Sequence, residues 1–478
     1  MANRKVDVAI IGAGTAGLAA YRTVRDHTES VVLIEGGPYG TTCARVGCMP
    51  SKLLIAAAEA AHAVAEAPVF GVRAGPARID GKAVMARVRA ERDRFVGFVL
   101  EAVDSFPKEH RLKGHARFTG DHRLQVGKDT TVEAGRIVIA TGSRPTYPRF
   151  LDVGELLATS DDVFDWTDLP ESAAVFGGGI VGLELGQALH RLGVRMRLFG
   201  KGGAVGPLGD PKVRDYAART FAAEFPFDPD AKVDAVEAQG GKVAVTFADA
   251  DGSERTETFD LLLAATGRRP NVDRLELERT SLELDGKGVP LFDRFTGQCG
   301  DSHVFIAGDV DDEVPLLHEA ADEGKIAGDN AGRYPDVRAQ TRRAALGIVF
   351  SDPQIATVGR SYRELQAEGV DHAIGETSFE DQGRSRVINQ NRGLLRLYGA
   401  HGTGRFLGAE MVGPRAEHIG HLLAWAAQQG LSVGEMLAMP FYHPVIEEGL
   451  RTGLRDLNRR LRMGPEVVPR CLDCGPGG

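Results

Sequence analysis

VDVAIIGAGTAGLAAYRTVRDHTESVVLIE, residues 6–35, contains an apolar run, a glycine turn, an amphipathic segment and a second apolar run. Gly12, Gly14 and Gly17 form the pattern GxGxxG directly after the first run. The first glycine permits the turn, the second lets the backbone approach a pyrophosphate, and the third lets helix and strand pack closely. Glu35 ends the second run, where a carboxylate can accept both ribose hydroxyls. The stretch therefore predicts a strand–helix–strand unit that binds a dinucleotide.

The same pattern occurs a second time in SAAVFGGGIVGLELGQALHRLGVRMRLFG, residues 172–200, with Gly177, Gly179 and Gly182 as its glycines. Each copy is followed later by a similar turn. The turns are ATGSRP at 140–145, which contains Gly142, and ATGRRPN at 265–271, which contains Gly267. We therefore expect two dinucleotide sites, one for a tightly held cofactor and one for an exchangeable one.

The second copy differs from the first at the position where a carboxylate is expected. Gly200 takes the place of Glu35, Lys201 follows it, and Arg195 and Arg197 precede it. A cation at this point suits a 2′-phosphate, so the sequence favours NADPH over NADH. The alternative is that these basic residues are only solvated.

The rest of the chain indicates an α/β protein of several domains. Its 478 residues suggest about three domains, at roughly 150 residues each. The phrase VFIAGDV, residues 304–310, ends a strand with a possible ligand-binding residue, Asp309. From about residue 346 the sequence pattern changes and predicts a sheet with packed helices. The expected units are a discontinuous first dinucleotide-binding domain (1–150 and 275–345), a second dinucleotide-binding domain (151–274), a C-terminal α+β domain (346–465) and a flexible CxxC tail (466–478).

Composition excludes several classes of protein. The net charge of −9 disfavours a nucleic-acid or membrane-surface binder, and no uninterrupted apolar run reaches about 18 residues. The 60 glycines are not periodic, so a collagen-like chain is excluded. The N-terminal basic residues and short apolar run resemble a signal peptide, but the run ends in the glycine turn and is interpreted as a strand. Five cysteines are too few for a disulfide framework, so a cytoplasmic location is expected.

Two cysteines, Cys43 and Cys48, lie in GTTCARVGCMPSK, residues 40–52, soon after the first dinucleotide unit. In a regular helix their Cα atoms would be about 8.6 Å apart, whereas a disulfide needs roughly 4.4–6.8 Å. A bond between them requires a distorted first turn, which Gly47 would permit. Such a bond is easily reduced and suits redox catalysis. A metal pair or two buried thiols are the alternatives. Of the other cysteines, Cys299 is expected to be a lone thiol.

His443 and Glu448 lie in FYHPVIEEGLRTGLRD, where Pro444 suits the start of a helix. A histidine held by a carboxylate can act as a base for a thiol, and as a cation it stabilises a thiolate. The pattern alone is equally compatible with a surface histidine. The upstream cysteine pair favours the catalytic interpretation.

Taken together and in this order, these motifs resemble the class I pyridine nucleotide-disulfide oxidoreductases over essentially the whole chain. That family includes dihydrolipoamide dehydrogenase, glutathione reductase and mercuric reductase. The stretch at 40–52 resembles dihydrolipoamide dehydrogenase most closely, although Thr41 stands where the family usually has a glycine. The resemblance implies FAD and NAD(P) as cofactors, two Rossmann-like domains and a C-terminal dimerisation domain. It also implies a small dithiol or lipoyl group as substrate.

The resemblance assigns a role to each candidate residue. Cys48 would be the charge-transfer thiol beside the flavin, and Cys43 the thiol that meets the substrate. Lys52 would lie near the flavin N5 and pair with Glu184. The remaining roles are ribityl binding by Asp309, and proton transfer by His443 with Glu448 to the disulfide of the other subunit of a homodimer.

Several residues depart from the common pattern. Phe441 replaces a histidine that usually precedes the catalytic one, and Ile180 stands where several relatives carry a gating tyrosine. Cys471 and Cys474 form a C-terminal CxxC, a feature of mercuric reductase and of large thioredoxin reductases. The alternative function is therefore an NADPH-driven reductase of a protein disulfide or a metal ion. Mercuric reductase itself is disfavoured because it has tyrosine at the position of His443.

Glutathione reductase is disfavoured because the coenzyme loop offers only Lys201, and soluble transhydrogenases because they usually lack the first cysteine. The retained cysteines, histidine and glutamate together disfavour a non-catalytic FAD-binding subunit.

Overall fold

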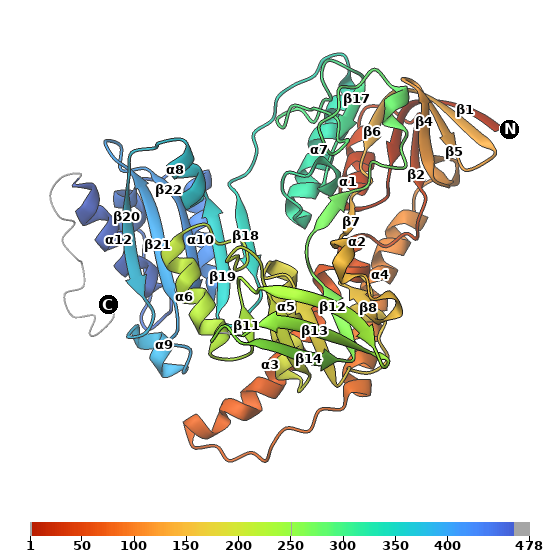
Figure 1. Ribbon diagram of the computed structural model, residues 1–478. Coiled ribbons are helices and arrows are strands. Elements are labelled where there is room, and N and C mark those ends of the chain that lie inside the picture. Colours follow the sequence, from red (N-terminus) through yellow and green to blue (C-terminus); the bar gives the residue numbers. More distant parts are fainter. Residues whose placement is uncertain (1, 250, 463–478) are drawn as a thin grey trace.

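The computed structural model describes residues 2–249 and 251–462 of the chain. Figure 1 shows three sheet-containing units. The N-terminal unit lies at the upper right, the second sheet at the lower centre, and the C-terminal sheet at the left. The predicted α/β fold class is confirmed. The predicted Cys471/Cys474 pair lies outside the described residues.

The first sheet is built around a buried parallel core. Its strands are β1 (Ala2–Ile11), β2 (Val31–Glu35), β3 (Arg111–Lys113), β4 (Ala116–Gly120), β5 (Arg123–Val126), β6 (Thr130–Ile139) and β17 (Val304–Ile306). They run in the order β3-β2-β1-β6-β5-β4, and β17 also pairs with β6. Because β17 follows the second unit in the sequence, the chain returns to complete the first sheet.

Helices cover this sheet closely. The helices of the unit are α1 (Thr15–Val24), α2 (Thr42–Val46), α3 (Cys48–Glu66), α4 (Gly81–Asp104) and α7 (Leu317–Arg333). Helices α1 and α7 meet at backbone distance. A Cβ atom on Gly324 would lie 2.2 Å from the carbonyl oxygen of Ala16, and one on Gly328 would lie 2.6 Å from that of Ala20. Small residues therefore fix how α7 lies against the first glycine helix.

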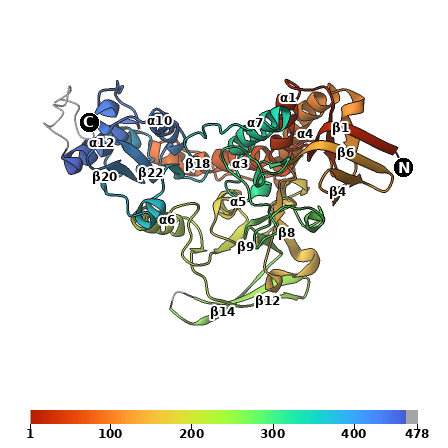
Figure 2. The ribbon, with the colours of Figure 1, turned by 90° about the horizontal axis from the view of Figure 1, so that it is seen from above.

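The second sheet repeats the parallel arrangement. Its strands are β8 (Leu157–Thr159), β9 (Ser172–Phe176), β10 (Arg195–Phe199), β11 (Phe227–Asp228) and β15 (Leu261–Ala264), in the order β11-β10-β9-β15-β8. Its helices are α5 (Ile180–Arg191) and α6 (Pro211–Ala222). An antiparallel sheet of β12 (Val233–Gln239), β13 (Lys242–Ala248) and β14 (Glu254–Phe259) projects from it (Figure 2). The two-stranded ribbon of β7 (Ser143–Pro145) and β16 (Arg268–Pro270) joins the two units.

The third sheet is antiparallel. Its strands are β18 (Leu346–Val349), β19 (Gln354–Gly359), β20 (His372–Ser378), β21 (Leu394–Ala400) and β22 (Phe406–Gly413), in the order β18-β19-β22-β21-β20. The accompanying helices are α8 (Tyr362–Ala367), α9 (Gly383–Val387), α10 (Ala416–Gln428), α11 (Val433–Leu437) and α12 (Glu448–Leu461).

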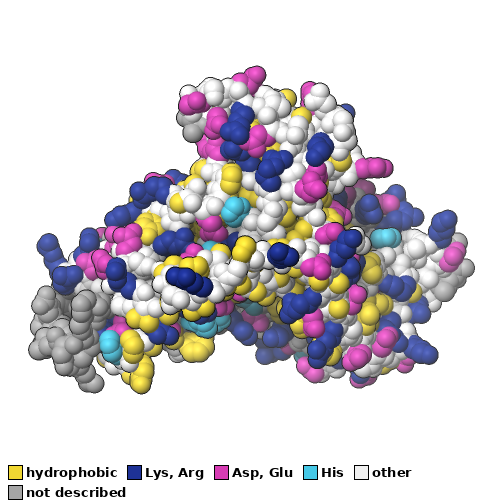
Figure 3. Space-filling view, turned by 90° about the horizontal axis from the view of Figure 1, so that it is seen from below, with side chains coloured by type: hydrophobic (Ala, Val, Ile, Leu, Met, Phe, Trp, Pro, Cys, Tyr) yellow, Lys and Arg dark blue, Asp and Glu magenta, His cyan; other side chains and the backbone are white. Residues whose placement is uncertain are grey.

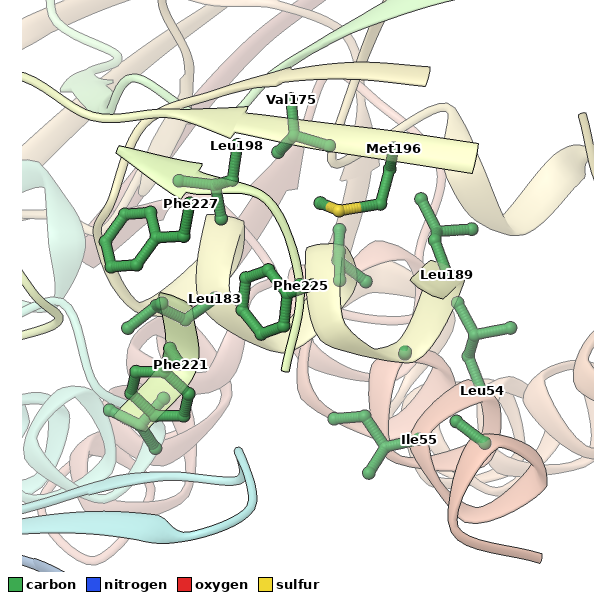
Figure 4. Packing of buried hydrophobic residues seen from close by; sticks show 14 of the residues in the cluster. Leu54, Ile55, Val175, Leu183, Leu189, Met196, Leu198, Phe221, Phe225 and Phe227 are labelled. Carbon is green, nitrogen blue, oxygen red and sulfur yellow. The ribbon is translucent and has the colours of Figure 1, made fainter. Parts of the chain in front are cut away.

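One apolar cluster crosses from the first unit into the second. Figure 4 shows Leu54 and Ile55 of α3 below Leu189 of α5. The opposite face of helix α5 packs against the second sheet. Leu54 and Leu189 are fully buried. Burial of one such side chain contributes about 1.5–3 kcal/mol, so the cysteine-bearing helix is held against the second unit by its own apolar face.

Part of α3 is more exposed than its apolar composition suggests. The segment Thr42–Phe70 is long and apolar enough to cross a membrane by length and composition, yet only 22% of its most apolar window is buried. This signal was missed in the sequence because alanines, rather than a run of large residues, produce it. Val69 and Phe70, in the short turn that follows α3, are 62% and 56% exposed. Figure 3 shows apolar side chains among the charged ones on the underside of the molecule.

Polar contacts at two buried carboxylates lock the second unit to the third sheet. Glu410 is fully buried in β22 and accepts the backbone N–H groups of Gly209 (2.6 Å), Asp210 (2.8 Å) and Tyr362 (2.9 Å). Asp210 caps α6 and accepts two bonds from Arg396 at 2.7 and 2.8 Å. Since a buried acceptor is costly to leave unpaired, these contacts fix the orientation of α6.

Glu410→Gln should lower the free energy of unfolding by about 2–3 kcal/mol, because an amide nitrogen would face N–H donors at the buried site. The matched control is Glu368→Gln, which removes an exposed carboxylate paired with Arg360. Thermal and denaturant unfolding of both variants would check this. Equal midpoints for the two variants would contradict the structural role of Glu410.

Candidate functional site

The two glycine turns have nearly the same geometry. Gly14 and Gly179 each precede their helix with φ −77° and ψ −172°. A Cβ atom on either of them would meet nothing within 4 Å, so the backbone there faces open space. Each turn therefore presents an uncovered helix N-terminus, which suits a diphosphate.

The flanking glycines are required for close packing. A Cβ on Gly12 would lie 2.2 Å from the carbonyl oxygen of Ala140, and one on Gly177 would lie 2.3 Å from that of Ala265. The third glycine of each turn packs against the first. A Cβ there would lie 1.9 Å from the oxygen of Gly12 or 1.8 Å from that of Gly177, which explains the glycines at positions 17 and 182.

One cavity of about 1490 Å³ connects both turns with the cysteine pair. Residues of all three units line it, since Ile348 and Glu417 come from the third. The candidate residues on its wall are Gly14, Cys43, Cys48, Lys52, Gly142, Gly177, Gly179, Glu184, Lys201, Gly267 and Asp309. The open backbone at both turns, together with this continuous space, fits two dinucleotides placed with the thiols between them.

Two carboxylates lie near the first turn, and one of them, Asp309, lines the cavity. Glu35 accepts the backbone N–H of Ala13 at 2.8 Å and that of Gly37 at 2.6 Å, and each oxygen retains a second lone pair for a ribose hydroxyl. Asp309 accepts the hydroxyl of Ser143 at 2.9 Å. These residues would hold the ribose and the ribityl chain of FAD.

Ser143 and Arg268 were not predicted as site residues. The Nε of Arg268 donates to the hydroxyl of Ser143 at 2.9 Å, and its Nη1 donates to Asp161 at 3.0 Å. Arg268 thus connects the ribbon of the second unit to the residue that orients Asp309. The repeated ATGSRP and ATGRRPN turns were the available signal, because both residues directly follow the shared glycine.

The helix that carries the thiols is broken between them. Helix α2 ends at Val46, α3 begins at Cys48, and Gly47 separates them with φ −127° and ψ −121°. The departure from family pattern at Thr41 has a structural counterpart, since its φ of 59° and ψ of 151° fall in a region that strongly favours glycine. Its hydroxyl accepts the N–H of Ala44 at 3.2 Å, which caps α2.

The two sulfur atoms differ in acidity. Both cysteines are free thiols in the structure. A hydrogen bond from Cys43 lowers the pKa of Cys48 to about 7, with a further contribution from the charge of Lys52. The same hydrogen bond and burial raise the pKa of Cys43 well above its usual range. Cys48 is therefore the preferred thiolate, and Cys43 the thiol that needs a base.

Lys52 is held by a buried carboxylate. Its Nζ lies 2.7 Å from Glu184 Oε2 and 3.0 Å from Oε1. Glu184 also accepts the backbone N–H of Phe350 at 2.9 Å, and Nζ lies 4.7 Å from the centre of that ring. Phe350, which the sequence analysis missed, thus joins the third unit to the thiol helix. No local motif marks it.

His443 and Glu448 form a pair away from this cavity. The Nδ1 of His443 donates to Glu448 at 3.0 and 3.1 Å, which leaves Nε2 as the acceptor. The Glu448 side chain is 4% exposed, whereas that of His443 is 64% exposed. Glu448 also accepts the N–H of Val445 at 3.2 Å. Within one chain, His443 is absent from the described wall of the cavity.

Of the three basic residues that the sequence offered for a 2′-phosphate, only Lys201 lines the cavity. Arg197 pairs with Glu257 at 3.0 Å, and Arg195 lies over the ring of Phe259 at 4.9 Å. Lys201 lines the cavity, and Lys232 does so beside it. Backbone geometry excludes a carboxylate at position 200, because a Cβ there would lie 2.6 Å from the carbonyl oxygen of Pro229.

Comparison with known proteins identifies the family. The model of the pyridine nucleotide-disulphide oxidoreductases matches residues 6–324, and the model of their dimerisation domain matches residues 346–453. The chain belongs to this family, whose members use FAD and NAD(P)H, so the predicted family and cofactors are confirmed. The dimerisation domain supports a homodimer.

The relatives include more than one activity. The chain is 32% identical to a mercuric reductase from Streptomyces lividans (92% of this chain, 93% of the relative). It is 30% identical to a dihydrolipoyl dehydrogenase from Halobacterium salinarum (92% and 94%). Among solved structures, the HOCl-induced flavoprotein disulfide reductase RclA from Escherichia coli has the same fold, with a TM-score of 0.79 and 22% identity over 95% of this chain and 99% of that one. The chain is a flavoprotein disulfide oxidoreductase, and these likenesses leave its substrate open.

Cys43→Ala should raise the pKa of Cys48 above about 7, because it removes the hydrogen bond that lowers this pKa most. Lys52→Met should raise it less. Less thiolate would then be present at pH 7, and alkylation would recover at higher pH. The measurement is the pH profile of Cys48 alkylation in the reduced enzyme, read by peptide mass spectrometry.

Lys242→Met is the matched control, since Lys242 is paired with Asp260 and lies away from the cavity wall. An unchanged Cys48 profile in Cys43→Ala would show that the assigned hydrogen bond does not set the acidity.

Proposed function

We propose that this enzyme is of the dihydrolipoamide dehydrogenase type and passes electrons between NAD(P)(H) and a small dithiol or lipoyl group. The observation that supports this most is the single cavity that brings both glycine turns to the cysteine pair. The His443–Glu448 pair adds the base that a thiol substrate needs. We further propose a cytoplasmic location, in keeping with the low cysteine content.

The two cysteines have different roles because their pKa values differ. Bound FAD would supply hydride exchange with the nicotinamide and two-electron exchange with the disulfide. Lys52, fixed by Glu184, keeps a positive charge near Cys48 and so favours its thiolate. Cys43, whose pKa is raised, attacks the external disulfide only once a base removes its proton.

The base is supplied by the second subunit. We propose that the partner subunit's His443 accepts the proton of Cys43 at Nε2, while its Glu448 carboxylate stabilises the resulting imidazolium. The exposed ring supports this, as do the 79% exposed Tyr442 and the 66% exposed Trp425 on the same unit. In sum, NAD(P)H, a proton and a disulfide give NAD(P)⁺ and a dithiol, and the sequence reverses with a dithiol donor.

A second candidate is an NADPH-driven reductase of a metal ion or a protein disulfide. The 32% identity with a mercuric reductase favours the metal-ion form. Two adjacent thiols at a cavity wall are also suitable ligands for a soft metal ion as substrate. The role proposed for Cys471 and Cys474 concerns residues outside the described part of the chain.

Steady-state kinetics distinguishes the two candidates. With lipoamide, the enzyme should turn over with a lower KM for NADPH than for NADH. Lys201→Ala should raise the KM for NADPH about 5- to 20-fold, because a cation beside a phosphate is lost, and leave NADH unaffected. Lys242→Ala is the control. Absent lipoamide turnover with mercuric-ion-dependent NADPH oxidation would support the second candidate and overturn the first.

Mixed dimers test the shared site. Cys48→Ser and His443→Ala should each be inactive, but equal mixing after dissociation should restore about one quarter of wild-type activity. Half of the dimers are then mixed, and each of those has one complete site. Activity should be measured with lipoamide after refolding together and separately. No recovery, despite mixed dimers detected by mass spectrometry, would place the base and the thiols in one chain.

A further inference from the structure

The turn that carries Asp309 depends on a group behind it. Gly308 has φ +79°, and its N–H donates to Glu323 Oε2 at 2.8 Å. The N–H of Asp311 donates to the carbonyl oxygen of Gly308 at 2.8 Å. Glu323 on α7 therefore binds the N–H of Gly308, and Asp311 binds its carbonyl oxygen. Neither residue was singled out in the sequence.

Three buried carboxyl groups lie here, and one guanidinium contacts two of them. Asp311 and Glu319 are each 6% exposed, and Glu323 is 4% exposed. Arg342 donates to Glu319 at 2.7 Å and to Glu323 at 2.5 Å. Three buried charges against one would be strongly unfavourable, so a further positive charge is required.

Asp311 is the member without a full set of partners. Its Oδ1 accepts the N–H of Glu313 at 3.0 Å, whereas its Oδ2 is buried with no hydrogen-bond partner among the described residues. Both Asp311 and Glu323 bind Gly308, Asp311 through its backbone N–H and Glu323 through its carboxylate, so the two residues contact the same turn. Burial, and then the charge of Glu323, raise the pKa of Asp311 to about 8.

A metal ion does not account for the missing charge. No group of three or more metal-ligating side chains in the described ranges is arranged to hold one. The charged groups that face or adjoin the pair are those of Glu313, Glu319, Arg342, Arg294 beside Glu313 at 3.8 Å, and His318 beside Glu319 at 3.9 Å. None of these cations donates to Asp311 Oδ2, which remains unpartnered.

We propose that Asp311 and Glu323 share one proton in the working enzyme, and that this proton holds the Gly308–Asp309 turn in the position that binds FAD. Asp311 is thus a positioning residue, which acts through Glu323 and Gly308. The proposal rests on the flavin site and not on the identity of the disulfide substrate, so it can fail while the proposed function stands.

The sign of the pH effect follows from linkage. The folded turn keeps the Asp311 proton up to about pH 8, whereas an opened turn releases it near the ordinary value of 3.8. Opening therefore becomes up to tenfold easier for each pH unit between these values and levels off above about pH 8. The rate of FAD release should follow the same profile.

The test compares the FAD-loaded wild type with Asp311→Asn. Release of FAD, followed by flavin fluorescence between pH 5.5 and 9, should accelerate up to tenfold per pH unit in the wild type and level off above about pH 8. In Asp311→Asn it should be nearly independent of pH, because the amide N–H replaces the shared proton. The thermal midpoint of each holoenzyme should fall as the release rate rises.

Two further variants complete the test. Asp322→Asn removes a carboxylate from the same helix, one paired with Arg343 at 2.9 Å, and should keep the wild-type profile. Glu323→Gln should also weaken the pH dependence between pH 5.5 and 9, because it removes the charge that helps to raise the pKa of Asp311, and it serves if Asp311→Asn does not fold. Equal slopes in the wild type and in a folded variant of the pair would overturn the proposal.

Discussion

The carboxylate of Glu184 is the point at which all three units meet. It binds Lys52 of the first unit at 2.7 Å and the backbone N–H of Phe350 of the third at 2.9 Å, while belonging to the second glycine helix itself. An unpaired buried carboxylate would be costly, so the three elements are stable only together. The same contact keeps a cation near Cys48 and sets the thiol helix against the second turn. Lys52, Glu184 and Phe350 all line the cavity between the units.

Local sequence patterns were sufficient to predict those parts of the fold where steric constraints allow only one kind of residue. The glycines at 12, 17, 177 and 182 leave no room for a Cβ, so sequence reports them directly. A break in the helix between the cysteines was expected because disulfide geometry requires it, and the structure has Gly47 at that place. These features depend on residues close in sequence.

The parts that the sequence did not reveal depend on distant residues. Phe350 contributes through its backbone N–H, which no side-chain pattern encodes. The Asp311–Glu323 pair arises only because α7 returns to the first glycine helix, and Arg268 matters only because β16 pairs with β7. The substrate is likewise undefined by local motifs, since the relatives with these motifs include both a mercuric reductase and dihydrolipoyl dehydrogenases.

We propose that electrons pass between the flavin and the disulfide through the sulfur of Cys48. Visible absorption before and after anaerobic two-electron reduction tests this most directly in the wild type, Cys43→Ser and Cys48→Ser. In the wild type, a long-wavelength thiolate–flavin band should appear after reduction. In Cys43→Ser, which has no disulfide to accept the electrons, the band should be present before reduction and disappear when the flavin is reduced. In Cys48→Ser it should be absent both before and after reduction. A band that persists in Cys48→Ser would contradict the account.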